Sequence, residues 1–365
     1  MQQISRRRFA QTLPYDGAVA AKRSALAGDD VARRPTLSAI AERAGTSIPT
    51  ASKALRGGTD VAPATRERIL RVAEELGYAP PKSAAAPQES GLVDFVLASG
   101  ESSWTNRALT GVEAAASDAD LDVVITLVRE ESDWVDRVLR RSSCGAILAV
   151  VQPTRDQWRR LSDAGRPVVL LDPMSSPPPG VGSVGAMNWQ GGRSAAEHLL
   201  ALGHTRLGVI DVSDSFEYSR ARLDGFRSVL AAAGIDLAAS HHTHAGWKRS
   251  SGREAALQML SASDRPTAIF ACTETLALGV YDAAAELKLS IPDELSVVGF
   301  DDLPEAGWAS PPMTTVQQPI AEMAASALRM LLRIGRTGDG GDGHAPREEL
   351  ATRLIVRGST GPVRH

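Results

Sequence analysis

Side chains suited to contacts with nucleic acid gather within residues 36–80. Five of them share the exposed side of one short predicted helix, with no acidic residue among them: Ile48, Pro49, Thr50, Lys53 and Arg56. Polar and basic groups on such a face can hydrogen-bond to base edges and to phosphates. We expect base-edge contacts from Ile48, Pro49, Thr50 and Lys53. The expected phosphate contacts come from Thr36, Ser47, Arg56, Thr65 and Tyr78.

Charge is distributed unevenly along the chain. Residues 1–90 hold 14 Lys and Arg against 9 Asp and Glu, a net charge of +5, whereas the whole chain carries −3. The rest of the chain therefore carries −8. A basic segment before an acidic body favours a nucleic-acid-binding domain joined to a larger domain with another role.

Two short helices must position the basic face. Residues 37–44 carry an apolar stripe that Thr36 can cap, and Gly45 follows, where a helix end often requires a positive φ. Ser47 can cap the second helix, residues 48–55, because its hydroxyl accepts from an unpaired backbone N–H. This spacing is typical of a helix-turn-helix, whose second helix can enter the major groove.

A third helix is predicted to begin at Pro63. Its apolar residues keep helical spacing and form one stripe that can pack on the first two helices: Ile69, Val72, Ala73 and Leu76. Ala62 stands where Ser or Thr usually caps a helix, which costs about 1 kcal/mol. A small helical bundle without a DNA role is the alternative interpretation of this pattern.

Beyond a linker rich in Pro, Ala and Ser, short apolar runs alternate with amphipathic stretches. The first set has predicted strands at 92–98, 123–128, 146–151 and 168–171, with helices near 104–117, 131–141 and 154–164. A second set has strands at 207–210, 268–271 and 296–300. This alternation predicts two α/β lobes, each a parallel doubly wound sheet, with a cleft between them.

Three residues could provide the chemistry of a sugar site in this cleft. Sugar hydroxyls suit charged hydrogen-bonding groups, and sugar C–H faces suit an aromatic plate. Arg222 falls in the first turns of a helix after a strand, and Asp301 lies at the end of the strand motif VVGFDD, directly after residues 296–300. Trp247 lies in a predicted loop. Structural alternatives remain for all three: a surface ion pair for Arg222 with Asp224 or Asp302, loop packing for Trp247 and a helix cap for Asp301.

Further candidates for the cleft are less distinctive. Ser99 ends the first strand and, with Trp104, could line the opposite wall. Trp308 is a third conspicuous aromatic residue near Asp301. The expected ligand-binding set also includes Thr273.

The motifs together identify a resemblance that covers nearly all of the chain after residue 35. The chain reads T-L-x-x-I-A-x-x-A-G-T-S, T-A-S-K-A-L, V-A-P-A-T-R-E-R-I and L-G-Y-A-P in order, and later VVGFDD, PPMTTVQQP and RLIVRGST. It resembles the lactose-repressor (LacI/GalR) family of transcription regulators. In sugar-responsive members of that family, the positions matching Arg222, Trp247 and Asp301 hold the effector. The position of Thr273 is often Asn there.

The resemblance implies an all-α helix-turn-helix headpiece and a body like the type I periplasmic sugar-binding proteins. The expected domains are a disordered basic tail (1–35), the headpiece (36–80), a hinge (81–91) and an effector-binding and dimerisation domain (92–363). Within the body, lobe 1 would hold residues 92–188 and 316–363 and lobe 2 residues 189–315. The chain would cross between the lobes three times.

One segment departs from the family pattern. In the family, a hinge helix folds on the operator and a Leu wedges into the minor groove. The matching position here is Pro87, and the usual Asn after Tyr-x-Pro is Pro81. The sequence therefore predicts a weaker or altered hinge contribution, although residues 82–86 could still form one helical turn.

Other functions find little support in the sequence. His241, His242 and His244 lie in a predicted loop without a common zinc spacing, so we expect neither a metal site nor a cofactor. Asp301 and Asp302 are adjacent strand residues that point to opposite faces, and no nucleotide-binding loop or nucleophile elbow is present. We therefore expect no catalytic residues.

The cysteines, the N-terminal motif and the length of the apolar runs indicate in which cellular compartment the protein acts. Cys144 and Cys272 are far apart in sequence and are expected to be reduced thiols. Residues 5–9 (SRRRF) resemble a twin-arginine export signal, but the stretch after them is not apolar. No run of 18 apolar residues is present.

The sequence therefore predicts a cytoplasmic, homodimeric repressor that binds a pseudo-palindromic operator under the control of a small sugar or sugar derivative. An exported sugar-binding protein with the same body fold is the first alternative. An enzyme on the same α/β scaffold is the second.

Overall fold

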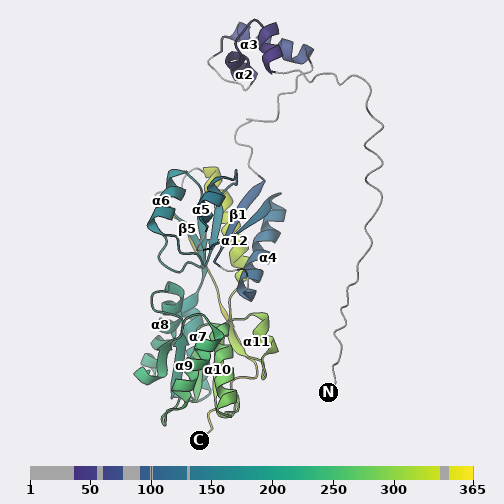
Figure 1. The fold of residues 1–365 in the computed structure, drawn as a ribbon. Helices are drawn as coiled ribbons and strands as arrows, with labels where there is room; N and C mark the ends of the chain where they lie inside the picture. The colour runs from purple at the N-terminus through teal and green to yellow at the C-terminus, as the bar shows by residue number, and fades with distance from the viewer. Residues whose placement is uncertain are drawn as a thin grey trace, which may run out of the picture. The chain divides into compact units, whose positions relative to one another are not determined.

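The computed structural model describes residues 37–55, 61–76, 91–98, 100, 102–129, 132–337 and 345–364, apart from the side chains of Leu37, Pro49, Ser52 and Thr337. The chain divides into two compact units, Met1–Gln88 and Glu89–His365. Figure 1 shows the helices of the first unit and the two sheets of the second. In the part of the chain so described, no helix combines the length and apolar character that a membrane span requires.

The described residues of the first unit, 37–55 and 61–76, form three helices, as predicted: α1 (Leu37–Arg43), α2 (Ile48–Leu55) and α3 (Pro63–Glu75). Gly45 has the expected positive φ, +59°, in the turn between α1 and α2. The Ser47 hydroxyl accepts from the backbone N–H of Thr50 at 3.3 Å, which caps α2. At Ala62, before α3, no side chain caps the helix.

The core of this unit consists of small and branched apolar residues from all three helices, the turn after α1 and the turn before α3: Ile40, Ala41, Ala44, Ala51, Ala54, Val61, Ile69, Val72 and Ala73. Because the buried stripe of α2 consists of alanines, that helix can pack closely on its neighbours. Its opposite side is left exposed, with Ile48 at 48% relative exposure.

The first lobe of the second unit is built on a sheet of six parallel strands in the order β11-β5-β4-β3-β1-β2. The strands are β1 (Leu92–Leu97), β2 (Asp122–Leu127), β3 (Ala146–Ala149), β4 (Val168–Leu171), β5 (Gly182–Ala186) and β11 (Arg347–Leu350). Helices α4 (Ser103–Asp118) and α12 (Ile320–Thr337) cover one face. Helices α5 (Trp134–Leu139) and α6 (Arg155–Asp163) cover the other.

The second lobe repeats the plan in the order β12-β10-β9-β8-β6-β7, with only β12 antiparallel among the strands described. The strands are β6 (Leu207–Asp211), β7 (His242–His244), β8 (Ala268–Ala271), β9 (Ser296–Asp301), β10 (Thr314–Gln317) and β12 (Arg353–Ile355). Helices α7 (Asn188–Ala201) and α8 (Glu217–Ala232) cover one face, and α9 (Arg249–Leu260) and α10 (Glu274–Glu286) the other. A 3₁₀ turn (Ala239–His241) precedes β7, and α11 (Pro304–Trp308) follows β9.

The chain passes between the lobes three times, after β5, after β10 and after β11, as expected. The assignment of residues 316–363 to lobe 1 was nevertheless wrong at both ends, since residues 316 and 317 belong to β10 of the second sheet. Strand β12 pairs with β10 of the second sheet, and Ser359 donates to Val297 O of β9 at 2.6 Å. Only α12 and β11 of that segment join the first lobe.

Two glycines bring α7 and α8 into close contact. A Cβ on Gly192 would lie 1.9 Å from Arg222 O, and one on Gly225 would lie 1.9 Å from Trp189 O. Only glycine can occupy either place without moving a backbone. The contact fixes the first turns of both helices, which carry most of the residues of the site described next.

Candidate functional site

Arg222 is fully buried at 1% relative exposure, in the second turn of α8. Its Nε donates to Asn188 Oδ1 at 2.8 Å and its Nη1 to Cys272 O at 2.5 Å. Nη1 also lies 3.5 Å from Asp301 Oδ1, and the guanidinium stacks 3.7 Å above the Phe300 ring. The surface ion pair considered for Arg222 is therefore ruled out, and a buried charge pair with Asp301 replaces it.

Asp301 ends β9 with a φ of 116°, a strained conformation for a residue with a side chain. Burial raises the pKa of its carboxyl to about 6, although Arg222 and a hydrogen bond from Gln318 Nε2 at 2.5 Å act to lower it. It does not cap α11, because Leu303 is the N-cap and no side chain serves there. Asp302 has separate partners, Arg357 and Gln317, so the two carboxylates do not act on one bond.

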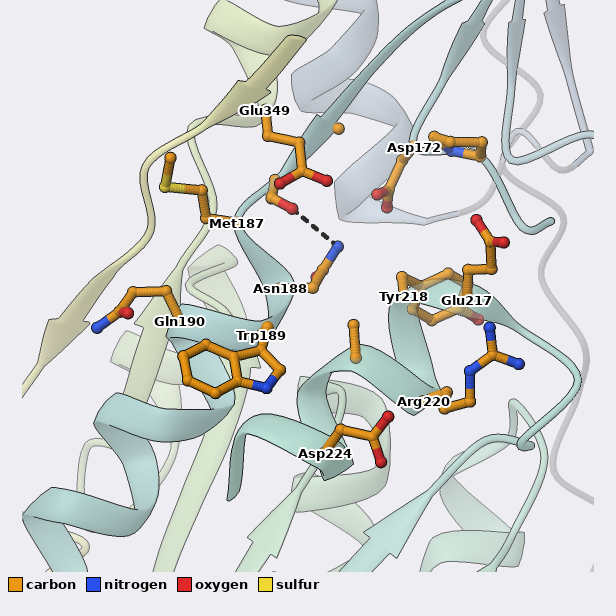
Figure 2. Close-up of a pocket in the computed structure, with 14 residues that line it drawn as sticks. Asp172, Met187, Asn188, Trp189, Gln190, Glu217, Tyr218, Arg220, Asp224 and Glu349 are labelled. Carbon is orange, nitrogen blue, oxygen red and sulfur yellow. Dashed lines mark hydrogen bonds between the residues drawn. The ribbon is translucent and has the colours of Figure 1, made fainter. Parts of the chain in front are cut away.

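A cavity of about 520 Å³ lies between the lobes beside this charge pair. Figure 2 shows side chains that line it: Asp172 and Glu349 come from the first lobe, and Trp189, Tyr218 and Asp224 from the second. Asn188, also in the lining, donates its Nδ2 to Ala186 O at 3.1 Å (Figure 2). Its amide oxygen is held by Arg222, so Asn188 links the buried pair to the cavity wall.

Two buried polar atoms of residues that line the cavity lack hydrogen-bond partners among the described residues. They are Asp172 Oδ1 and the Tyr218 hydroxyl. Asp172 directly follows β4, and burial raises the pKa of its carboxyl against the effect of Arg222. Burial likewise raises the pKa of the Tyr218 hydroxyl, so this group is a neutral donor at physiological pH. Such groups are satisfied when a ligand that can hydrogen-bond enters the cavity.

Four residues of the lining were not predicted from the sequence: Asp172, Asn188, Trp189 and Tyr218. A signal existed for Asp172, because it follows the predicted strand at 168–171 just as Asp301 follows the one at 296–300. The other three depend on how α7 and α8 face the first lobe, which the sequence does not reveal.

The remaining predicted ligand residues take several positions. Trp247 is 47% exposed, and its ring packs against Phe216 and Tyr218 with centroid distances of 5.5 and 5.9 Å, so it stands beside the cavity wall. Thr273 caps α10 by accepting from Leu276 N at 3.2 Å. Trp104 packs against the core of the first lobe. Trp308 is 78% exposed and, like Trp104 and Thr273, is not among the residues that line the cavity. Ser99 is outside the described residues.

Direct contacts tie the lobes together around the cavity. The Ser103 hydroxyl of α4 donates to Glu305 of α11. On α8, Glu217 donates its backbone N–H to Met174 O at 3.0 Å and accepts from the Ser176 hydroxyl. These bonds join residues from different lobes, so a change in lobe angle has to break or replace them.

On the headpiece, the predicted DNA-contacting residues are only partly described. Ile48 and Lys53 are exposed on α2, and Thr50 is half-buried with its hydroxyl 2.8 Å from that of Ser47. Thr65 is half-buried in the first turn of α3. Thr36, Arg56, Tyr78 and the side chain of Pro49 lie outside the described residues, as does the hinge position Pro87.

Both the headpiece and the body of the chain are similar to known protein families. Residues 36–81 match the model of bacterial regulatory proteins of the lacI family, and residues 196–360 match a periplasmic binding protein-like domain. The HTH-type transcriptional regulator CelR of Thermobifida fusca is 30% identical over 339 residues, which cover 90% of this chain and 98% of CelR. The chain belongs to the lacI family and is a helix-turn-helix transcriptional regulator.

Two solved structures of the family share its fold. A complex of the regulator CelR with cellobiose superposes with a TM-score of 0.68 at 28% identity, covering 89% of this chain and all of the other. The lac repressor dimer bound to operator and the anti-inducer ONPF superposes with a TM-score of 0.67 at 26% identity, covering 90% of this chain and all of the other. The predicted family and fold class are thereby confirmed.

Proposed function

We propose that this regulator is a homodimeric repressor whose affinity for a pseudo-palindromic operator is controlled by a small, uncharged, polyhydroxylated ligand. The observation that carries the proposal is the pair of unpartnered polar atoms, Asp172 Oδ1 and the Tyr218 hydroxyl, in the cavity between the lobes. A sugar offers hydroxyl groups that can both donate to the carboxylate and accept from the phenol. No step of this function requires catalysis, and the chain would act in the cytoplasm on chromosomal DNA.

The charges around the cavity support an uncharged ligand over an anionic one. A single basic side chain, Arg220, lines the cavity, and the charge of the nearby Arg222 is paired with that of Asp301. Four carboxyl side chains line it: Asp172, Glu217, Asp224 and Glu349. Carboxylates are hydrogen-bond acceptors for hydroxyls and repel phosphates. A sugar therefore fits the lining better than a sugar phosphate does.

Ligand control would act through the angle between the lobes. A ligand that bridges Asp172 of the first lobe and Tyr218 of the second stabilises one lobe angle over another. The contacts of Glu305 and Glu217 between lobes would shift with it. In a dimer, a change in lobe angle alters the spacing of the two headpieces. The ligand then changes operator affinity by the same coupling free energy by which the operator changes ligand affinity.

Operator contacts would come from α2 and its surroundings. Ile48, Thr50 and Lys53 are the described residues proposed to meet base edges, with Ser47 and Thr65 on phosphates. Arg56, Pro49, Thr36 and Tyr78 remain proposed contacts from the sequence. The dimer bound to operator in the lac repressor structure supports the two-headpiece arrangement.

Selection of binding sites from a random duplex library, followed by fluorescence anisotropy, tests the DNA part. Titration of the full chain with a sugar panel in a calorimeter tests the ligand part. Cellobiose is the first sugar to try, since it is bound in the similar CelR structure. A selected palindrome bound at nanomolar concentration, and released or tightened by one sugar, is expected. Recovery of no preferred sequence would overturn the proposal.

A further inference from the structure

A buried carboxylate and two imidazoles converge at the edge of the second sheet. In the β6–β7 pairing, Asp211 stands opposite His244, and His242 faces Val209 two residues earlier. Because strand side chains alternate, His242 and His244 project to the same face. The interpretation of residues 241–244 as a loop was wrong at this point, since His242–His244 form β7.

The distances between these groups fit a small ion-binding site. His244 Nδ1 lies 2.5 Å from Asp211 Oδ1, and His242 Nε2 lies 3.2 Å from Asp211 Oδ2. The three ligand atoms are all within 4.8 Å of one another. Bonds of about 2.0–2.1 Å to a tetrahedral metal place ligand atoms about 3.4 Å apart, so small side-chain movements suffice.

The environment of Asp211 favours a cation. Its side chain is fully buried, and both carboxylate oxygens face the two imidazoles. Each imidazole can bind a metal once the ring nitrogen toward Asp211 is deprotonated. The His244 side chain is 44% exposed, which gives an ion a route from solvent.

We propose that Asp211, His242 and His244 form a binding site for a divalent transition-metal ion of the Zn²⁺ class. Two imidazoles and one carboxylate are the ligands that Zn²⁺, Ni²⁺ and Cu²⁺ prefer over Mg²⁺ or Ca²⁺. With three protein ligands, the remaining positions hold water. The ion would cross-link edge strand β7 to β6.

One neighbouring group opposes the cation. Arg227 Nη2 of α8 lies 3.2 Å from His242 Nδ1, on the side of the ring away from Asp211. When His242 Nε2 binds a metal, Nδ1 carries the proton and Arg227 has to move away. Arg227 is exposed and can do so, but its charge weakens binding. Removal of that charge should therefore tighten the site.

The site also borders the wall of the cavity. Ala245 and Gly246, directly after His244, donate to Asp211 O and Val212 O at 2.8 and 3.3 Å. The next residue is Trp247, which packs on Tyr218. Metal binding would therefore hold the segment that carries Trp247, although the existence of the site does not depend on any ligand in the cavity.

Calorimetric titration of the untagged, chelator-treated full chain with ZnCl₂ at pH 7.5 tests the proposal. We expect saturable binding of one Zn²⁺ per chain and a higher melting temperature with Zn²⁺ present. His242→Ala and His244→Ala should each weaken binding by about tenfold or more. Arg227→Ala should tighten it, and the adjacent control His241→Gln, whose ring lies 3.7 Å from Asp264 instead, should leave it unchanged.

Absence of saturable Zn²⁺ binding would overturn the proposal. So would binding that persists in the double variant His242→Ala/His244→Ala, since the ion would then be held elsewhere. Because His244 is partly exposed on an edge strand, we expect His244→Ala to fold, so the test does not depend on a substitution of the buried Asp211. Circular dichroism of each variant confirms that a lost signal is not lost structure.

Discussion

Replacing Asp172 with Asn should make the protein more stable and less able to bind its effector. The carboxyl is buried, its Oδ1 lacks a partner, and burial raises its pKa above the ordinary value. The native state therefore binds a proton more tightly than the unfolded state does. The stability contributed by that proton is present at acid pH and is lost as pH rises through the native pKa.

The magnitude follows from the unsatisfied oxygen. A buried polar group without a partner costs about 1–3 kcal/mol, and Asp172→Asn should recover part of this at pH 7 because the amide carries no charge. At about 2–4 °C per kcal/mol for a domain of this size, the melting temperature should rise by less than about 12 °C. A hydrogen bond to a charged group contributes about 1.5–3 kcal/mol, so sugar affinity should fall about 10- to 150-fold.

Two assays separate these effects. Thermal unfolding at pH 4 and pH 7, without ligand, should show the stability gain at pH 7 and little difference at pH 4. Calorimetry with the sugar identified from the panel should show the loss of affinity. Asp163→Asn on the exposed surface of α6 is the matched control and should change neither quantity. A variant that melts below the wild type at pH 7, or that binds sugar normally, would refute the role given to Asp172.

Three further predictions concern other parts of the chain. Burial raises the pKa of Glu274 to about 9, so this carboxyl should make the wild type lose stability between pH 4.5 and 9. Glu274→Gln should make the slope of stability against pH shallower and gain up to about 3 kcal/mol at pH 7, measured by urea unfolding at several pH values. A slope as steep as that of the wild type would contradict this. Ala62→Ser should supply the missing cap of α3 and stabilise the headpiece by about 1 kcal/mol, seen as slower amide exchange in α3, whereas Ala62→Gly should gain less. Glu305→Gln should weaken the contact with Ser103 between the lobes and change the sugar concentration needed for half-maximal operator response; an unchanged value would show that this contact does not set the lobe angle.

Strong local signals account for the elements that the sequence predicted well. The strands at 168–171 and 268–271 are continuous apolar runs, and the structure gives them the same bounds. The five strands that the sequence did not predict lack a continuous apolar run of four residues: β5 is GSVGA, β7 is HTH, β10 is TTVQ, β11 is REEL and β12 is RLI. Short, polar or glycine-rich strands form only because a neighbouring strand supplies hydrogen bonds, which is long-range information.

The candidate site divides along similar lines. Arg222 and Asp301 stood out because each follows a predicted strand, and the structure places them in one buried pair. Trp308 was equally conspicuous in sequence, yet it is mostly exposed, because an aromatic residue near a strand end can face either side of a short helix. Tyr218 was inconspicuous and became part of the site only through the packing of α8 against α7.

Operator affinity with and without sugar, in the wild type and in the double variant Asp172→Asn/Tyr218→Phe, tests the central claim most directly. Both substitutions keep side-chain shape: Asp172→Asn replaces the carboxylate with a neutral amide, and Tyr218→Phe removes the hydroxyl. Anisotropy should show a sugar-dependent change of tenfold or more in wild-type affinity for the selected operator. The double variant should bind the operator equally well without sugar and show no change with it. An unaltered sugar response in the double variant would contradict the claim that this cavity controls DNA binding.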